Sequence, residues 1–65
     1  MILKNVKYIM KYIVINEINI PVFCKQCRVT AATFNRILEG KHISFISYYK
    51  ICKNLNVSLK RLQET

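Results

Sequence analysis

Acidic side chains are scarce in this sequence. Three Asp or Glu residues stand against eleven Lys or Arg, for a formal net charge of +8 in 65 residues. A bias of this size indicates a polyanionic partner, either nucleic acid or an anionic membrane surface. The charge does not choose between these partners, and a solvated basic face that keeps the protein soluble would also produce it.

Long hydrophobic runs are missing as well. No uncharged run approaches the ~20 residues that a membrane span needs. Residues 1–19 are interrupted by Lys4, Lys7, Lys11 and Glu17, and no small-residue cleavage site follows, so we predict neither a signal peptide nor a membrane partner. We expect a cytoplasmic protein with one domain, residues 1–65. Such a domain hides only about 60% of its unfolded surface, too little for an elaborate catalytic cleft, so we expect no enzyme.

Cysteine occurs only at Cys24, Cys27 and Cys52. A structural zinc site needs four ligands, usually two Cys pairs or a Cys pair with a His pair, whereas here Cys52 and His42 would have to complete an irregular set. A thioredoxin-like role needs a βαβ setting, which the pattern lacks. Each cysteine falls on an inward helical face, where a thiol behaves as a small hydrophobe. We expect no metal, no cofactor and no disulfide.

Apolar residues recur at steps of three and four along the N-terminal half, which predicts helices. The first helix is expected from Ile2 to about Ile15, with one apolar stripe made of Ile2, Val6, Ile9, Met10 and Ile13. Asn19 is a suitable N-cap for a second helix that runs to about Cys27, with Pro21 in its first turn and Phe23 and Cys27 inward. Arg28 and Val29 make the following turn.

The C-terminal half continues the pattern. Thr30 caps a third helix and Gly40 ends it, and the inward residues are Phe34, Ile37 and Leu38. Ser44 caps a fourth helix, in which the inward residues are Phe45, Tyr48, Ile51, Cys52 and Leu55. A break at residues 56–58 precedes a last turn, Leu59–Gln63, with Leu62 inward. The predicted fold class is therefore all-α, a compact five-helix bundle.

These elements resemble the Cro/phage-repressor (XRE-like) helix-turn-helix family from about Leu3 to Leu62. The resemblance rests on INIPVFCKQCRVTAATFNRILEGK followed by SFISYYKICKNLNVSLKRL. In that family a short helix, a tight turn and a second capped helix place a recognition helix in the DNA major groove. The resemblance implies a lambda-repressor-like bundle that binds double-stranded DNA sequence-specifically, as a transcriptional repressor or regulator of phage or mobile-element type.

The chain departs from the family pattern at several positions. Arg28 stands where the family usually has Gly, so a non-Gly residue is expected in an unfavourable backbone conformation. Ile20 replaces a Gln that contacts phosphate, and Glu39 replaces a neutral Asn, so that a carboxylate would repel phosphate there. Ile13 and Leu38 replace an Arg–Glu pair, a joint change that leaves no unpaired buried charge.

The resemblance makes residues of about 31–38 the recognition helix. Arg36 can bond guanine through two hydrogen bonds and Asn35 can do the same with adenine, whereas alanines offer only methyl contacts to thymine. Arg36 could instead pair with Glu39 as a solvated helix residue. A recognition helix with so few base-contacting side chains indicates modest discrimination between DNA sequences, or an A·T-rich site recognised through its shape. The candidate base contacts are Ala31, Ala32, Thr33, Asn35 and Arg36, and the candidate phosphate contacts are Lys25, Thr30, Lys41, His42 and Ser44, together with the free N–H groups that open the second helix.

One recognition helix buries too little surface for tight binding, so we expect a weak homodimer through about residues 56–62. Two other functions stay open. An antitoxin or antirepressor would use the same fold mainly for protein–protein binding, which Ile20, Glu39 and the two alanines favour. A cationic membrane-active peptide would have strongly amphipathic helices without turn signals, whereas Thr30, Gly40 and Ser44 punctuate a globular bundle.

Overall fold

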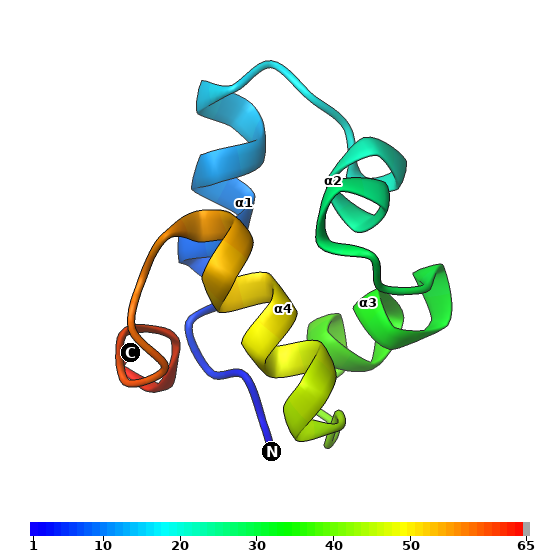
Figure 1. Ribbon diagram of the computed structural model, residues 1–65. Helices are drawn as coiled ribbons and strands as arrows, with labels where there is room; N and C mark the ends of the chain where they lie inside the picture. The colour runs from blue at the N-terminus through cyan, green and yellow to red at the C-terminus, as the bar shows by residue number, and fades with distance from the viewer. Residues whose placement is uncertain (65) are drawn as a thin grey trace.

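The computed structural model describes residues 1–64, and these form four α-helices with a short 3-10 turn near the C-terminus and no strand (Figure 1). The elements are α1 (Val6–Ile15), α2 (Ile20–Cys27), α3 (Ala31–Leu38), α4 (Phe45–Leu55) and η1 (Arg61–Gln63). The expected all-α class is confirmed. The count of five helices is not, because the expected fifth helix is the three-residue turn η1. Among residues 1–64, no helix has the length and apolar character that crossing a membrane requires.

Each α-helix begins at a side-chain cap. The oxygens of Asn19, Thr30 and Ser44 accept hydrogen bonds from the backbone N–H groups of Val22, Thr33 and Ser47 at 2.9, 3.1 and 3.1 Å. These bonds satisfy donors that have no partner inside the helix, which is why Asn, Thr and Ser mark helix starts. The sequence predicts all three of these caps, so the starts of α2, α3 and α4 are confirmed.

The N-terminal segment, residues 1–5, does not belong to the first helix as predicted. Asn5 caps α1 instead, through a bond of 3.3 Å from the N–H of Tyr8. The N–H groups of Lys4 and Asn5 donate to the carbonyl oxygen of Leu62 at 3.1 and 2.9 Å, and Met1 and Ile43 exchange two bonds at 2.8 and 2.7 Å. Figure 1 shows the segment lying beside the C-terminal turn. These bonds span most of the sequence, so local periodicity could not reveal them.

The core gathers side chains from every helix around Phe23 and Tyr48. The ring of Phe23 meets those of Tyr12 in α1 and Phe34 in α3 edge-on, with centroids 5.8 and 5.9 Å apart. Tyr48 is buried, and its hydroxyl donates to the carbonyl oxygen of Leu59 at 2.7 Å. The other buried side chains are Leu3, Ile9, Ile13, Cys24, Cys27, Ile37, Ile43, Ile51, Cys52, Leu55 and Leu62.

Two residues predicted to point inward are exposed. Leu38 is 47% exposed and Phe45 is 55% exposed. Leu38 is the last residue of α3 and Phe45 is the first residue of α4, so both lie at helix ends. Leu3 and Ile43, which belong to no helix, are buried and fill this end of the core. Ile2, Val6 and Met10 of the predicted first stripe are only partly buried.

The connection from α2 to α3 consists of Arg28, Val29 and Thr30. Arg28 is left-handed, with φ of 60° and ψ of 43°, and the N–H of Val29 donates to the carbonyl oxygen of Cys24 at 3.0 Å. A side chain in this conformation costs roughly 1–2 kcal/mol. The expected left-handed backbone at the non-glycine residue Arg28 is therefore confirmed, and Gly40, with φ of 71°, ends α3 in the left-handed conformation as expected.

Arg28→Gly is expected to raise the free energy of unfolding by about 1 kcal/mol, because glycine takes the left-handed conformation without steric penalty. Urea unfolding followed by circular dichroism measures the change. Asn56 has nearly the same backbone conformation, with φ of 57°, but asparagine tolerates this conformation better than arginine does. Asn56→Gly should therefore raise the free energy of unfolding much less. Equal gains for the two variants would contradict strain at Arg28.

Candidate nucleic-acid interface

The outer face of α3 carries small and polar side chains. Phe34 and Ile37 are buried against the core, and Thr33 is half-buried. The remaining four candidate base-contact residues are exposed, namely Ala31, Ala32, Asn35 and Arg36. Figure 1 shows α3 at the periphery of the molecule, following directly on α2. All five candidates therefore stand on one helix with an accessible face that begins at its N-terminus.

Arg36 is attached to the loop that follows its helix. Its Nε–H donates to the carbonyl oxygen of His42 at 2.8 Å, and its own carbonyl accepts from the N–H of Lys41 at 2.8 Å. A guanidinium has five N–H donors, so the two Nη groups keep theirs. The carboxylate of Glu39 pairs with Lys41, Nζ to Oε2 3.6 Å, and not with Arg36 as the alternative interpretation held. Nothing in the sequence predicted the hydrogen bond from Arg36 to the His42 carbonyl.

The predicted phosphate contacts fall into two groups. Lys25, Lys41 and His42 are exposed, the first in the last turn of α2 and the others in the loop after α3. The Lys41–Glu39 pair is itself exposed, 55% and 56%, and such a pair is worth at most about 1 kcal/mol, so Lys41 can leave it for a phosphate at little cost. The hydroxyls of Thr30 and Ser44 already accept their cap bonds and lie 3.0 Å from the hydroxyls of Thr33 and Ser47.

The start of α2 has few donors left for a phosphate. Pro21 has no N–H, the N–H of Val22 bonds the Asn19 side chain, and that of Phe23 bonds the Asn19 carbonyl at 3.0 Å. This leaves the N–H of Ile20. The expectation of a phosphate site built from several free N–H groups at this helix start is therefore not favoured. At the start of α3, in contrast, two consecutive residues, Ala31 and Ala32, show no hydrogen bond from their N–H groups within residues 1–64.

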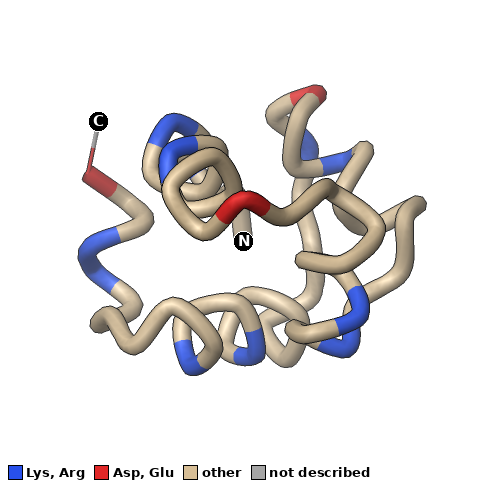
Figure 2. The backbone as a smooth tube through the Cα atoms, turned by 90° about the horizontal axis from the view of Figure 1, so that it is seen from above, with Lys and Arg blue, Asp and Glu red and all other residues tan. Residues whose placement is uncertain are grey.

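Cations occur on every helix, whereas the three acids are isolated from one another (Figure 2). The acids Glu17, Glu39 and Glu64 are exposed and separate: they follow α1, end α3 and lie near the C-terminus. The charged residues of α2 and α4, and of the turn after α2, are all cations: Lys25, Arg28, Lys50 and Lys53. The charged side chains of these elements are therefore all positive, and Glu39 is the acid that follows α3.

The cysteines belong to the core, as predicted. Cys24, Cys27 and Cys52 are buried and free. Burial raises the pKa of the Cys27 thiol from 9.0 to about 12, and the neighbouring Cys24 adds to the rise. Burial also raises the pKa of the Cys24 and Cys52 thiols. Since the thiolate is the nucleophile and the metal ligand, these thiols are inert at neutral pH. Among residues 1–64, no three His, Cys, Asp or Glu side chains are grouped to hold a metal ion.

The raised thiol pKa values predict alkaline sensitivity. Above about pH 9 unfolded thiols ionise while the buried ones stay protonated up to a pKa of about 12 for Cys27. The folded state then binds more protons, so stability should fall with rising pH, by up to about 1.4 kcal/mol per pH unit for one thiol. Urea unfolding from about pH 8 to about pH 10.5 under reducing conditions measures this. Cys27→Ala should show a shallower fall, and an unchanged slope would contradict the assignment.

The segment expected to form a dimer, residues 56–62, turns its apolar side chains inward. Leu62 is fully buried, and Val57 and Leu59 pack partly against the core. The exposed side chains of the segment are those of Asn56, Ser58, Lys60 and Arg61. The guanidinium of Arg61 lies over the ring of Tyr8, 5.5 Å from its centroid. A partner at this surface would therefore meet polar and cationic groups.

No protein-family model matches this chain, and neither a curated protein nor a solved structure matches it. The resemblance of its motifs to the helix-turn-helix family stays an interpretation of the sequence. The physical basis for a function is the geometry above: an exposed face of α3 with small side chains at its start, a three-residue turn before it and cations around it.

Proposed function

We propose that α2, the turn at Arg28–Thr30 and α3 form a helix-turn-helix that places α3 in the major groove of double-stranded DNA. The protein is then a sequence-specific regulator, a repressor of phage or mobile-element type. The observation that carries this proposal is the accessible face of α3, whose first turn holds two alanines in front of Asn35 and Arg36. A recognition helix enters the groove with its N-terminal half, where small side chains permit a close approach.

The chemistry of this face matches base edges in the groove. The amide of Asn35 can pair with adenine, and the free Nη groups of Arg36 can donate to guanine O6 and N7. The bond from Arg36 Nε to the His42 carbonyl restricts the guanidinium before DNA arrives. A side chain ordered in advance loses less entropy on binding, which favours affinity. The methyl groups of Ala31 and Ala32 suit thymine, so an A·T-rich half-site with one guanine fits best.

Contacts to phosphate would come from beside the recognition helix. Lys41 and His42 are exposed in the loop after α3, and Lys25 lies in the last turn of α2. Each phosphate that such cations neutralise steepens the salt dependence of binding by about 0.9 in the log–log slope. The net charge of +8 supports this electrostatic contribution. Glu39 opposes it, and its pairing with Lys41 limits the repulsion.

A weak homodimer through residues 56–62 belongs to the same proposal. The exposed side chains there are polar or cationic, so little apolar surface is available to hold two copies together in solution. Two half-sites on one duplex would bring the copies together, and the pairing would then add specificity rather than stable association.

Selection of random duplexes by the purified protein, at near-physiological salt, tests the proposal. We expect enrichment of an inverted repeat whose half-sites are about ten base pairs apart. A protein with Asn35 and Arg36 both replaced by alanine is the matched control, because both side chains are exposed and the fold should survive. Recovery of no sequence above the salt-sensitive background would refute sequence-specific binding.

The second candidate is an antitoxin or antirepressor that uses this fold mainly to bind protein. It is favoured by the large apolar side chains exposed at the start of α4, Phe45, Ile46 and Tyr49, because clustered exposed apolar side chains are typical of protein–protein contacts. A failed duplex selection together with a specific protein complex would support it.

A further inference from the structure

A groove separates the C-terminal end of α2 from the outer face of α4. Its volume is about 750 Å³. The lining residues come from both helices and the turn between α2 and α3: Gln26, Cys27, Arg28, Ile46, Tyr49, Lys50, Lys53 and Asn54. None of these residues is among the candidate DNA contacts. The groove is therefore a second surface, distinct from the face of α3.

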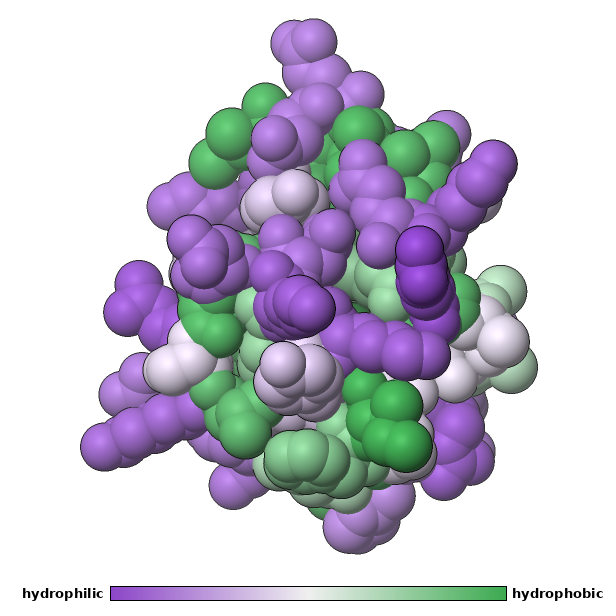
Figure 3. All heavy atoms as spheres, in the orientation of Figure 1, coloured by the Kyte–Doolittle hydropathy of each residue, from purple (hydrophilic) through white to green (hydrophobic). Residues whose placement is uncertain are grey.

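One side of the groove is apolar. Ile46 is 65% exposed and Tyr49 is 50% exposed, and Phe45 adjoins them at 55%. In Figure 3 apolar side chains lie together on the lower part of this face, below a band of hydrophilic ones, and further apolar side chains lie near its upper edge. Large apolar side chains that cluster on one exposed helix face mark an interaction surface more often than single ones do. This side of the groove can therefore hold apolar side chains of a partner.

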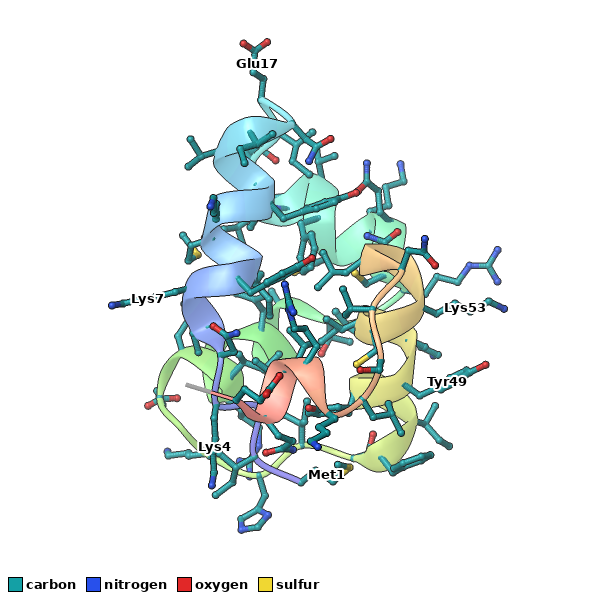
Figure 4. All side chains as sticks on the ribbon, turned by 90° about the vertical axis from the view of Figure 1, so that its left-hand side faces the viewer. Met1, Lys4, Lys7, Glu17, Tyr49 and Lys53 are labelled. Atoms are coloured by element: carbon teal, nitrogen blue, oxygen red, sulfur yellow. The ribbon has the colours of Figure 1, made fainter. Side chains whose placement is uncertain are left out.

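The other side of the groove is cationic. Arg28, Lys50 and Lys53 line it, and no Asp or Glu does. Tyr49 and Lys53 are one helical turn apart and project from the same side of α4 (Figure 4). Lys50 Nζ donates to the carbonyl oxygen of Arg28 at 3.4 Å, which links α4 to the turn after α2. Lys50 is thus held beside the apolar residues, and Arg28 and Lys53 line the same groove.

Asn54 adds a polar group that lacks a partner. Its Nδ2 is buried and makes no hydrogen bond within residues 1–64. Buried amide donors are satisfied in most proteins, and Asn54 lines the groove.

We propose that this groove docks an acidic amphipathic segment of another protein. Apolar side chains of the segment cover Ile46 and Tyr49, and its carboxylates pair with Arg28, Lys50 and Lys53. A helix that lays its apolar face in a groove is a common form of peptide recognition, and the complementary charge selects an acidic one. This proposal does not rest on DNA binding.

Two other occupants fit less well. A second copy of this chain in a two-fold arrangement would set the same patch against itself, so Arg28, Lys50 and Lys53 would face one another. The three acids of the chain lie elsewhere. A DNA backbone would pair with the cations but leave Phe45, Ile46 and Tyr49 uncovered. An acidic segment with apolar side chains satisfies both sides of the groove.

Selection of displayed random peptides, each about 15 residues long as in a short helical ligand, tests the proposal on the intact protein. Lys50→Glu/Lys53→Glu is the groove variant, and Lys4→Glu/Lys7→Glu is its control on the opposite side of the molecule (Figure 4). Each replacement changes the charge by two, so both variants fall from the +8 of the native chain to +4. We expect enriched peptides that are acidic and carry spaced apolar residues. Their affinity should drop at least ~10-fold on the groove variant and far less on the control.

Exposed apolar positions provide a second pair that does not alter charge. Ile46→Ser should also lower the affinity for the selected peptide ~5-fold or more. Val14 lies on α1 and is 72% exposed, so Val14→Ser should leave that affinity unchanged. Amide chemical shifts in two-dimensional NMR locate the bound peptide, with shifts expected at α4 and the turn after α2. No enrichment, equal losses on groove and control variants, or shifts confined to other elements would overturn the proposal. Displacement of the peptide by short duplex DNA, with the same shifts, would also overturn it and assign the groove to phosphate.

Discussion

Phe23→Ala is expected to lower the free energy of unfolding by about 3–5 kcal/mol, the usual loss for a large buried aromatic side chain. Phe23 is fully buried and its ring touches those of Tyr12 and Phe34. It therefore joins α1, α2 and α3, and its loss leaves a cavity among three helices. A domain of 65 residues has only roughly 3–10 kcal/mol of stability in total, so much of the variant should be unfolded at room temperature.

Urea and thermal unfolding followed by circular dichroism measure this loss. Phe45→Ala is the matched control, because the same side chain is removed from a site that is 55% exposed, where we expect a loss below about 1 kcal/mol. The proposed DNA binding of Phe23→Ala should fail in proportion to its unfolded fraction, and a stabilising osmolyte should restore it. Similar losses for the two phenylalanines would mean that the core is not organised around Phe23.

Arg36→Ala is expected to weaken binding to the selected duplex by about 1–3 kcal/mol, with most of the loss at a single base pair. Arg36→Lys keeps the charge but removes both the fork of Nη donors and the Nε bond to the His42 carbonyl, so it should lose almost as much. Competition binding against duplexes altered one base pair at a time measures the specificity profile. The profile should flatten at one position for both Arg36 variants.

Lys41→Ala is the control for the role of Arg36. Its charge should act on phosphate, so all duplexes should weaken alike and the log–log salt slope should fall by about one. Lys41 also pairs with Glu39, so Lys41→Ala alone would leave an unpaired carboxylate that repels DNA. The double variant Lys41→Ala/Glu39→Gln removes this carboxylate and isolates the effect of the lost lysine. Equal losses on every sequence for Arg36→Ala and Lys41→Ala would disprove the assigned difference between base and phosphate contacts.

The helix boundaries were predictable because their signals are local. Asn19, Thr30 and Ser44 lie at the starts of α2, α3 and α4, and each bonds an N–H group three residues further on. The left-handed backbone at Arg28 was anticipated on a different ground, the resemblance to a family that usually has Gly at this position. Steps of three and four residues predicted most of the inward faces. The errors are Leu38 and Phe45, which are exposed at helix ends, and Ile2, Val6 and Met10, which are only partly buried.

The candidate site was predictable as a set of residues but not as a set of contacts. The helix that carries Ala31 to Arg36 lies where the sequence indicated, with its polar face outward. The bond from Arg36 to the His42 carbonyl and the pairing of Glu39 with Lys41 had no signal, because each depends on the path of the loop after Gly40. The groove between α2 and α4 was missed since its two sides lie far apart in the sequence.

Composition and local pattern were enough to establish the helical class, the starts of α2, α3 and α4, the burial of the cysteines and the strong positive charge. These properties depend on neighbours within one or two helical turns or on composition, so they can be read without knowing how the helices pack. The packing of distant segments was needed to show that residues 1–5 lie outside the first helix and bond Leu62 and Ile43. It also showed that Phe45, Ile46 and Tyr49 are exposed beside Arg28, Lys50 and Lys53. Those outcomes depend on which distant segments meet. Local propensity leaves several conformations of similar energy, and long-range hydrogen bonds and packing in the core select among them.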